Sequence, residues 1–278
     1  MENWYIFLIV VCVFLVTFII LRLKMYFKLC SYRQKHFNKN NTGSVHIPKK
    51  IFQLYFNSNE MHPSIKKNIE YIKKLNPEWT YILYDKEQDM VQYIKKHYSP
   101  YILNIYNKIN PEYGAAKADF FRYLLMYKEG GVYLDSKSGM EYPLNKIIKE
   151  DDEYILSHWL FGKPFKETIN NEFGEFQQWH IICKPNHLFL KAVIDNVIKN
   201  IENYDINKDG VGNGVLLLTG PVVYSKSIIP LLSSNKHRIC KMNEYIGLIY
   251  NNVSYNFFGH RKTLGKTHYS KLKTPIIK

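Results

Sequence analysis

The chain has 278 residues, which is long enough for one sizeable α/β domain and an accessory segment. Hydrophobic residues make up 46% of it and charged residues 22%, as in ordinary globular proteins, and the net charge is +14. Because the basic residues are scattered and form no clustered arm, the charge favours anionic ligands or a membrane surface, and we expect no nucleic-acid partner.

The first predicted element is an N-terminal membrane helix. The stretch from Tyr5 to Leu21 carries no charged residue, and with Trp4 and Leu23 it approaches the ~20 residues that cross a bilayer. A signal peptide is the rival interpretation, but no basic segment precedes the stretch and no small-residue cleavage site follows it. We therefore expect a single-pass membrane anchor within residues 1–24, which contacts the bilayer through residues 4–23.

A polar and basic segment without apolar periodicity follows at residues 25–45, and it is predicted to be a stem. Basic residues recur from Arg22 to Lys39, whereas only Glu2 precedes the span, so the positive-inside bias places the following domain in the cytosol. The domain itself is expected to span residues 46–278.

The domain opens with alternating strand and helix patterns. Residues 47–56 (IPKKIFQLYF) are rich in β-forming types and predict a strand, Pro63 to Leu75 has helical spacing, and Trp79 to Tyr84 predicts a second strand. Helical patterns follow at residues 90–97 and 101–109. This alternation predicts an α/β sheet.

The central stretch, residues 114–143, combines a helix, a glycine stop and a buried strand. Asp119 and Arg122 lie three residues apart and project from one helix face. Gly130 and Gly131 are suited to the left-handed backbone that ends a helix. The strand that follows delivers Asp135 to its carboxyl end, which is where open α/β sheets bind ligands.

Beyond this centre, residues 153–160 predict another strand, and residues 167–178 form a polar loop suited to act as a flap over an acceptor. A strand, a turn and a long helix are expected from residue 177 onward. Cys183 and Cys240 are interpreted either as a disulfide or as two buried thiols.

Residues 119–137 (DFFRYLLMYKEGGVYLDSK) resemble the core of the glycosyltransferases with a DXD-containing sugar-binding region, classified as glycosyltransferase family 32, which includes viral and capsule enzymes. The family pattern is an Asp, two apolar residues, Arg-Tyr, a Leu-rich helix, Gly-Gly, a strand and Asp-x-Asp. The opening strand and the Thr219-Gly220-Pro221 segment also resemble the family. The resemblance implies a GT-A-like fold, a Rossmann-like mixed sheet with flanking helices in a single domain.

The resemblance also implies roles for individual residues. Asp119 would bind hydroxyls of the donor sugar, Arg122 would contact the sugar or the diphosphate, and Asp135 would contact a metal, the ribose or the sugar. The remaining donor-binding candidates lie in the opening strand, after the central strand and near the C-terminus: Gln53, Leu54, Tyr55, Lys137 and His268.

The sequence departs from the family at Lys137, which stands where the second Asp of Asp-x-Asp is expected. Two such carboxylates hold Mn²⁺ or Mg²⁺, and an ammonium binds no metal but pairs directly with phosphate. Three interpretations remain open. The site works without a metal, Glu141 completes a metal site with Asp135, or the enzyme is inactive.

These features together predict a membrane-anchored glycosyltransferase. It would move a sugar from a GDP- or UDP-sugar to a glycan, glycoprotein or glycolipid acceptor, with retention of configuration, in a membrane of the Golgi or endoplasmic reticulum type or a viral or host membrane. Resemblance to Golgi-type members places the domain in the lumen, opposite to the charge bias. The alternative is an inactive transferase-like domain that binds a sugar nucleotide or a glycan.

Overall fold

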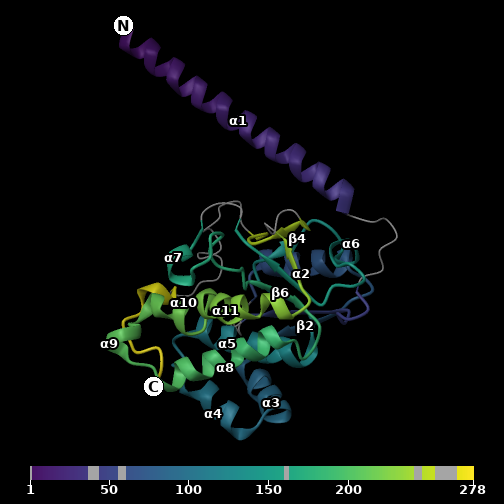
Figure 1. The fold of residues 1–278 in the computed structure, drawn as a ribbon, viewed down its shortest axis with the longest axis vertical. Helices are drawn as coiled ribbons and strands as arrows, with labels where there is room; N and C mark the ends of the chain where they lie inside the picture. Colours follow the sequence, from purple (N-terminus) through teal and green to yellow (C-terminus); the bar gives the residue numbers. More distant parts are fainter. Residues whose placement is uncertain (1, 37–43, 56–60, 160–162, 241–245, 254–267) are drawn as a thin grey trace.

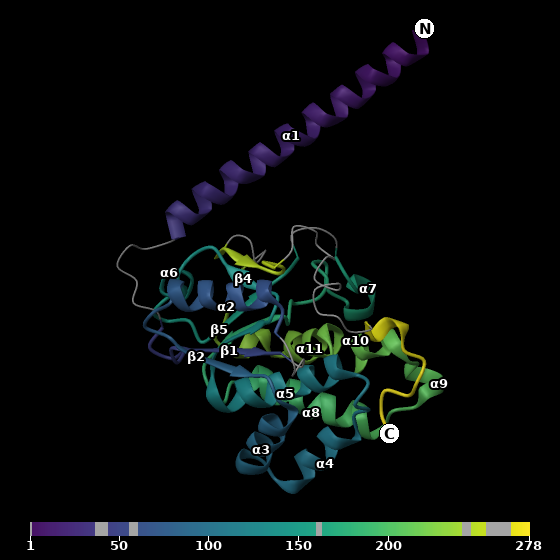
Figure 2. The ribbon, with the colours of Figure 1, turned by 180° about the vertical axis from the view of Figure 1, so that it is seen from behind.

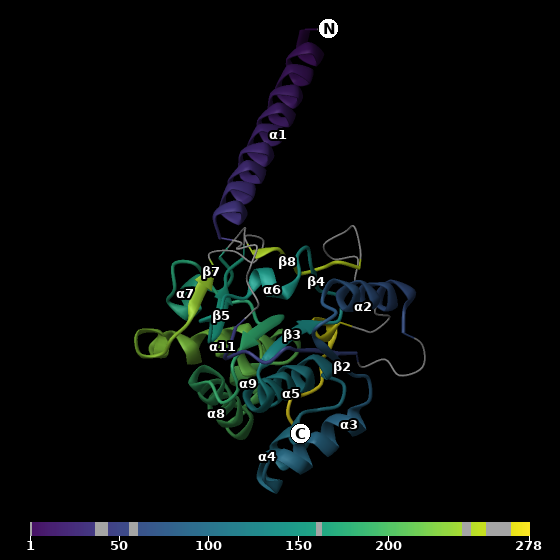
Figure 3. The ribbon, with the colours of Figure 1, turned by 90° about the vertical axis from the view of Figure 1, so that its right-hand side faces the viewer.

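The protein consists of one long N-terminal helix and an α/β domain in which helices cover both faces of a mixed sheet (Figure 1). Helix α1 (Glu2–His36) extends away from the domain in all three views (Figures 1–3). The computed structural model describes residues 2–36, 44–55, 61–159, 163–240, 246–253 and 268–278.

The main sheet has the strand order β2-β1-β3-β6-β5-β7. The three strands β2, β1 and β3 run parallel, and β6 is antiparallel to both of its neighbours, β3 and β5. A separate antiparallel ribbon pairs β4 with β8. The strands are β1 (Lys50–Leu54), β2 (Thr80–Tyr84), β3 (Gly131–Asp135), β4 (Gly139–Met140), β5 (Tyr154–Ser157), β6 (His180–Cys183), β7 (Arg238–Cys240) and β8 (Leu248–Ile249).

Two layers of helices enclose the sheet (Figure 2). One face packs against α3, α4, α5, α8 and α11, and the other against α2, α6 and the β4–β8 ribbon. The helices of the domain are α2 (Pro63–Leu75), α3 (Glu87–His97), α4 (Pro100–Lys108), α5 (Gly114–Glu129), α6 (Leu144–Ile147), α7 (Lys166–Ile169), α8 (Leu188–Glu202), α9 (Ile206–Asp209), α10 (Val215–Leu218) and α11 (Pro221–Ile228), with 3₁₀ turns η1 (Gly212–Gly214), η2 (Ile229–Ser234) and η4 (Tyr269–Lys271).

Strand alternation divides the core between these two faces. Phe52 and Tyr133 point to the α5 side, whereas Ile51, Val132 and Leu134 point to the α2 side. All five side chains are at most 1% exposed. Because β1 and β3 are central and buried on both faces, their carboxyl ends are held in a fixed position.

Helix α5 is buried along its whole stretch from Ala116 to Met126, where no residue is more than 8% exposed. It ends at Gly130, whose φ of 61° lies in the left-handed region, and Gly131 follows with φ 91°. A Cβ on Gly131 would lie 2.6 Å from the Lys50 carbonyl oxygen, so the strand β3 can begin beside β1 only with a glycine here.

We expect Gly131→Ala to lower the free energy of unfolding by about 1–3 kcal/mol, because it adds a backbone clash to a strained φ. Urea unfolding followed by tryptophan fluorescence measures the loss. Gly210→Ala is the matched control, since Gly210 also has a positive φ, 70°, but a Cβ there would meet no atom within 4 Å. Equal losses in the two variants would contradict the clash.

The C-terminal residues are attached to the segment that precedes α5. The carbonyl oxygen of Ile276 accepts from the Asn110 N–H, and Thr274 accepts from the Tyr113 hydroxyl at 2.6 Å. Ile277 forms a β-bridge with Ile109. The chain end therefore closes the side of the domain from which α5 departs.

The structure confirms the α/β class and the predicted elements around the sheet. The predicted helix from Pro63 to Leu75 is α2, with Pro63 in its first turn, and His187 caps α8 by accepting from the Phe189 N–H. The predicted polar flap differs, because Glu175, Phe176 and Gln177 are buried and only its first part is exposed. The Phe176 N–H donates to Ser225 Oγ, which fixes this segment against α11.

Helix α1 contains the predicted membrane span. Its side chains from Trp4 to Leu23 are exposed, and its hydroxyl at Thr17 donates to the Val13 carbonyl, so this polar group is satisfied within the helix. The helix continues to His36, so the first part of the predicted stem is helical; no Gly or Pro interrupts it there. A second apolar segment of comparable length, residues 212–234, is mostly buried in the domain core.

Cys183 and Cys240 are both free and buried, which supports the interpretation as buried thiols. Burial raises the pKa of each thiol, so both stay protonated.

Candidate donor-binding site

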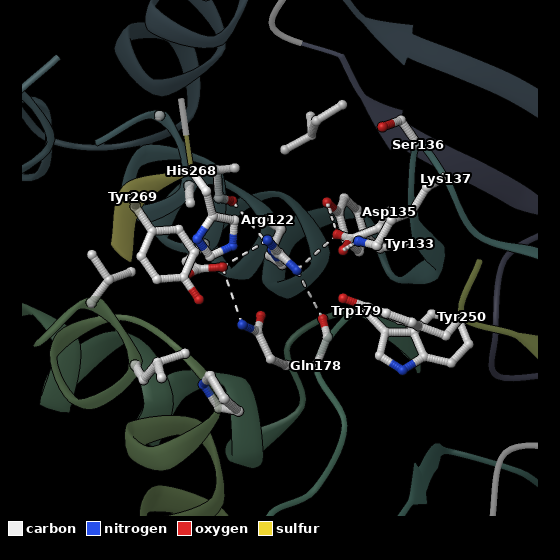
Figure 4. A pocket seen from close by; sticks show the side chains of 18 of the residues that line it. Arg122, Tyr133, Asp135, Ser136, Lys137, Gln178, Trp179, Tyr250, His268 and Tyr269 are labelled. Carbon is white, nitrogen blue, oxygen red and sulfur yellow. Dashed lines mark hydrogen bonds and ion pairs between the residues drawn. The ribbon is translucent and has the colours of Figure 1, made fainter. Parts of the chain in front are cut away.

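A cavity of about 470 Å³ opens at the carboxyl ends of β1 and β3. Its walls come from the residues after these strands, the first turns of α5, the segment that precedes β6, the start of α11, and the described residues 250 and 268–269. Figure 4 shows Arg122 in the middle, between Asp135 with Tyr133 on one side and His268 with Tyr269 on the other. The cavity thus lies where parallel sheets bind ligands.

Arg122 joins Asp119 and Asp135. Its Nη2 donates to Asp119 Oδ1 at 2.7 Å, and its Nη1 donates to Asp135 Oδ1 at 3.1 Å. The Gln178 carbonyl accepts from the same Nη1 at 3.0 Å, and the guanidinium lies 4.8 Å from the centre of the Tyr133 ring. A buried guanidinium shared by two carboxylates is held in one orientation.

Asp119 is 4% exposed, and its carboxylate accepts hydrogen bonds from its own helix and from two other segments of the chain. Besides Arg122, its Oδ1 accepts from Gln178 Nε2 at 3.1 Å, and its Oδ2 accepts from Thr219 Oγ1 at 3.1 Å. Burial raises the pKa of Asp119 to about 6, although Arg122, Gln178 and Thr219 oppose this rise. The carboxylate is therefore positioned precisely and partly protonated in mildly acidic solution.

Asp135 and Lys137 form the second ion pair. Lys137 Nζ lies 2.6 Å from Asp135 Oδ2, and 4.4 Å from the centre of the Tyr250 ring. The other oxygen, Oδ1, accepts from Arg122 and from the Tyr133 hydroxyl at 3.0 Å. Burial opposes ionisation of Asp135, but Lys137 and Arg122 outweigh it and hold its pKa below the ordinary value. Burial likewise lowers the pKa of Lys137, and Asp135 outweighs that effect and raises it.

The other predicted donor residues fall into two groups. Leu54, Tyr55 and His268 line the cavity, as do the predicted charged residues Asp119, Arg122, Asp135 and Lys137. Gln53 does not face the cavity. Its Nε2 donates to the Asp135 carbonyl at 3.0 Å and its Oε1 accepts from the Tyr81 hydroxyl, so Gln53 joins β1, β2 and the end of β3. Gln53 thus holds the backbone of Asp135 in place from outside the cavity lining.

Three residues of the site were not predicted. Gln178 and Thr219 hold Asp119, and Glu175 lines the cavity from the segment predicted as a flap. Thr219 belongs to the Thr-Gly-Pro segment that resembles the family, and this resemblance was the one feature of the sequence that could have indicated its role.

Glu175 has an unusual environment for a carboxyl group. It is 6% exposed, and its Oε1 accepts from Trp159 Nε1 at 2.8 Å. Its Oε2 is buried and has no hydrogen-bond partner among the described residues. Burial raises the pKa of Glu175 to about 7, and the Trp159 hydrogen bond only partly opposes this. The side chain is thus poised between neutral and charged forms near neutral pH.

The residues of the cavity do not fit a divalent ion. Both oxygens of Asp135 already accept from cationic groups, and Lys137 Nζ lies beside the oxygen that an ion would use. Glu141, the other predicted carboxylate, is exposed and does not line the cavity. No cluster of three or more metal-binding side chains exists among the residues that the structure describes. With both of its oxygens paired, Asp135 by itself falls short of the oxygen ligands that Mg²⁺ or Mn²⁺ takes.

Residues 63–154 match the model of the glycosyltransferase sugar-binding region containing a DXD motif. The chain is 26% identical over 190 residues to an uncharacterized glycosyltransferase of Acanthamoeba polyphaga mimivirus, which covers 68% of this chain and 67% of that protein. Two proteins of Schizosaccharomyces pombe are also similar. The initiation-specific alpha-1,6-mannosyltransferase is 24% identical over 67% of this chain, and inositol phosphoceramide mannosyltransferase 1 is 25% identical over 77%. The matches span only 49% and 60% of those two proteins.

Solved structures share the fold. The PaToxG glycosyltransferase superposes with a TM-score of 0.50 at 15% identity, over 76% of each chain. The UDP-bound glycosyltransferase domain from the YGT toxin superposes with a TM-score of 0.51 at 10% identity, over 74% of this chain and 81% of that one. Together with the family match, they confirm the resemblance seen in the sequence and a glycosyltransferase fold.

Proposed function

Because the chain carries the sugar-binding region of the DXD-motif glycosyltransferase family, we propose that it transfers a sugar from a UDP- or GDP-sugar to a glycan, glycoprotein or glycolipid acceptor. The observation that carries this proposal is the convergence of Asp119, Arg122 and Asp135 in one cavity at the carboxyl edge of the sheet. The UDP bound to the YGT toxin domain and the similarity to two yeast mannosyltransferases support a nucleotide-sugar donor.

In the proposed reaction, the bond between the sugar C1 and the diphosphate oxygen breaks, and its electron pair stays on the diphosphate. The acceptor hydroxyl oxygen forms the new bond to C1 on the same face, and its proton passes to the departing diphosphate. Asp119 orients the sugar through its hydroxyls, and Arg122 and Lys137 stabilise the negative charge that builds on the leaving group.

The full chain in detergent tests this proposal. We expect it to release UDP or GDP from a nucleotide sugar, slowly to water and faster to an acceptor. Asp135→Asn should reduce this release by about 100-fold or more, because it removes the carboxylate that orients Arg122 and Lys137. Asp195→Asn, at an exposed pair with Lys191, is the control and should leave release unchanged. An Asp135→Asn variant as active as the unmodified chain would rule out this site.

A second candidate function is a binding domain without turnover, and Lys137 in place of the second Asp of the motif favours it. The two candidates differ in one measurement. A binding domain would be stabilised by a UDP- or GDP-sugar. It would release no nucleoside diphosphate in the presence of any acceptor mixture.

Membrane anchoring is the second part of the proposal and rests on α1. The helical segment from Trp4 to Leu23 has exposed, mostly apolar side chains and is long enough to span a bilayer. The chain should therefore stay in the membrane pellet after alkaline carbonate washing, and its release by that wash would exclude a spanning helix.

A further inference from the structure

The loop that follows β3 presents a lysine where a divalent ion is expected in this family. Lys137 is 8% exposed, and its Nζ lies 2.6 Å from Asp135 Oδ2 and over the ring of Tyr250. The ammonium lines the same cavity as Arg122. It is therefore a charged group that has lost most of its water and is available to a ligand at the site.

The backbone around Lys137 is fixed by residues from distant parts of the chain. The Lys137 carbonyl accepts from the Asn252 N–H at 2.7 Å, and the Ser138 N–H donates to the Asp135 carbonyl at 2.8 Å. Asn68 Nδ2 donates to the Ser138 carbonyl at 2.9 Å, and Asn252 Nδ2 donates to Asn68 Oδ1. Lys137 is thus preorganised, which is what stabilisation of developing charge requires.

The charges balance in the same way as in a metal site. Two carboxylates with one divalent ion sum to zero, and so does the pair of Asp135 with Lys137. An added divalent ion would have to separate Lys137 from Asp135 and lie close to both cations, Arg122 and Lys137. Repulsion between these charges opposes such binding strongly in a buried site.

We propose that the Lys137 ammonium takes the place of the divalent ion, so that it binds the diphosphate of the donor directly and nucleotide binding needs no metal. This inference rests on the proposed function, since it names the partner of Lys137 at that same site. It also accounts for the departure from Asp-x-Asp, because a second carboxylate in place of Lys137 would remove one of the two cations that Asp135 contacts.

The first experiment measures binding of UDP and of GDP to the full chain in detergent, with EDTA and with millimolar Mn²⁺. We expect at least one nucleotide to bind with the same affinity in both conditions. Electron paramagnetic resonance should show no Mn²⁺ bound at the site. Nucleotide binding that requires Mn²⁺, or Mn²⁺ that binds and responds to the nucleotide, would overturn the role of Lys137.

Three variants sharpen the test. Lys137→Asp restores Asp-x-Asp, and it should bind the nucleotide about 10- to 100-fold more weakly in EDTA and regain affinity with Mn²⁺. Lys137→Met should lose the same affinity without regaining it, and Lys137→Arg should keep metal-independent binding. If Lys137→Asp does not fold, the nucleotide affinities of Lys137→Met and Lys137→Arg in EDTA are compared instead. Equal affinities in these two variants would contradict the proposal.

The two proposals fail in different ways. If neither UDP nor GDP binds the unmodified chain in either condition, the proposed function is wrong and the partner of Lys137 with it. If binding occurs only with Mn²⁺, the proposed function stands and only the replacement of the ion by Lys137 is wrong.

Discussion

Replacing Arg122 with alanine is expected to lower the free energy of unfolding by about 3–5 kcal/mol, the cost of removing one partner from a buried ion pair. Arg122 is 5% exposed and is shared by Asp119 and Asp135, so its loss leaves one carboxylate without a cation and weakens the position of the other. Urea unfolding of the full chain in detergent, followed by tryptophan fluorescence, measures the change. The variant should also fail to release nucleoside diphosphate.

Two controls separate buried charge from general sensitivity. Lys191→Ala breaks an exposed pair with Asp195 and should cost less than about 1 kcal/mol. Adding Asp119→Asn to Arg122→Ala should recover part of the lost stability, because a neutral amide needs no cation. If the free energy of unfolding of the double variant is instead lower than that of Arg122→Ala, the unpaired Asp119 carboxylate is not the cause of the stability lost in Arg122→Ala.

Replacing Glu175 with glutamine is expected to stabilise the protein by about 3 kcal/mol at pH 8 and by little at pH 5. The pKa of Glu175 rises from 4.5 to about 7 on folding. Between these two values the folded state holds a proton that the unfolded state has released, so the free energy of unfolding falls as the pH rises. Above about pH 7 the full cost of the buried charge is present, and glutamine removes it.

Glutamine also keeps an oxygen for the Trp159 N–H, so packing changes little. Unfolding curves at pH 5, 6, 7 and 8 measure the trend, and Glu172→Gln, in the exposed part of the same loop, is the control. A difference between Glu175→Gln and the unmodified chain that does not grow with pH would show that Glu175 ionises normally.

Local sequence patterns were sufficient for the central part of the fold. Asp119 and Arg122 share a face because they lie three residues apart on a helix, and Asp135 comes at the end of the strand that Gly130 and Gly131 allow. These three side chains meet because α5 packs directly on β3 and β1. The prediction of the donor site therefore depended on neighbours in sequence becoming neighbours in space.

The remaining residues of the site depend on distant contacts that no local pattern records. Gln178 and Thr219 reach Asp119 across 59 and 100 residues of chain. The polarity of the 167–178 loop suggested a surface flap, but the antiparallel strand β6 places its second half inside the domain, where Glu175 is buried. Charge and polarity in a sequence do not reveal which polar groups will find buried partners.

The attachment of the C-terminal residues to the segment before α5 has a consequence for how the protein is made. The Tyr113 hydroxyl can donate to the Thr274 carbonyl only after 161 further residues have been synthesised. Loops of this length form slowly, since the entropy of closing them is lost before the contact is gained. Helix α1, by contrast, is complete within the first 36 residues. If α1 spans the membrane as proposed, the nascent protein is expected to be tethered before its domain closes, with the segment before α5 still lacking its C-terminal partner.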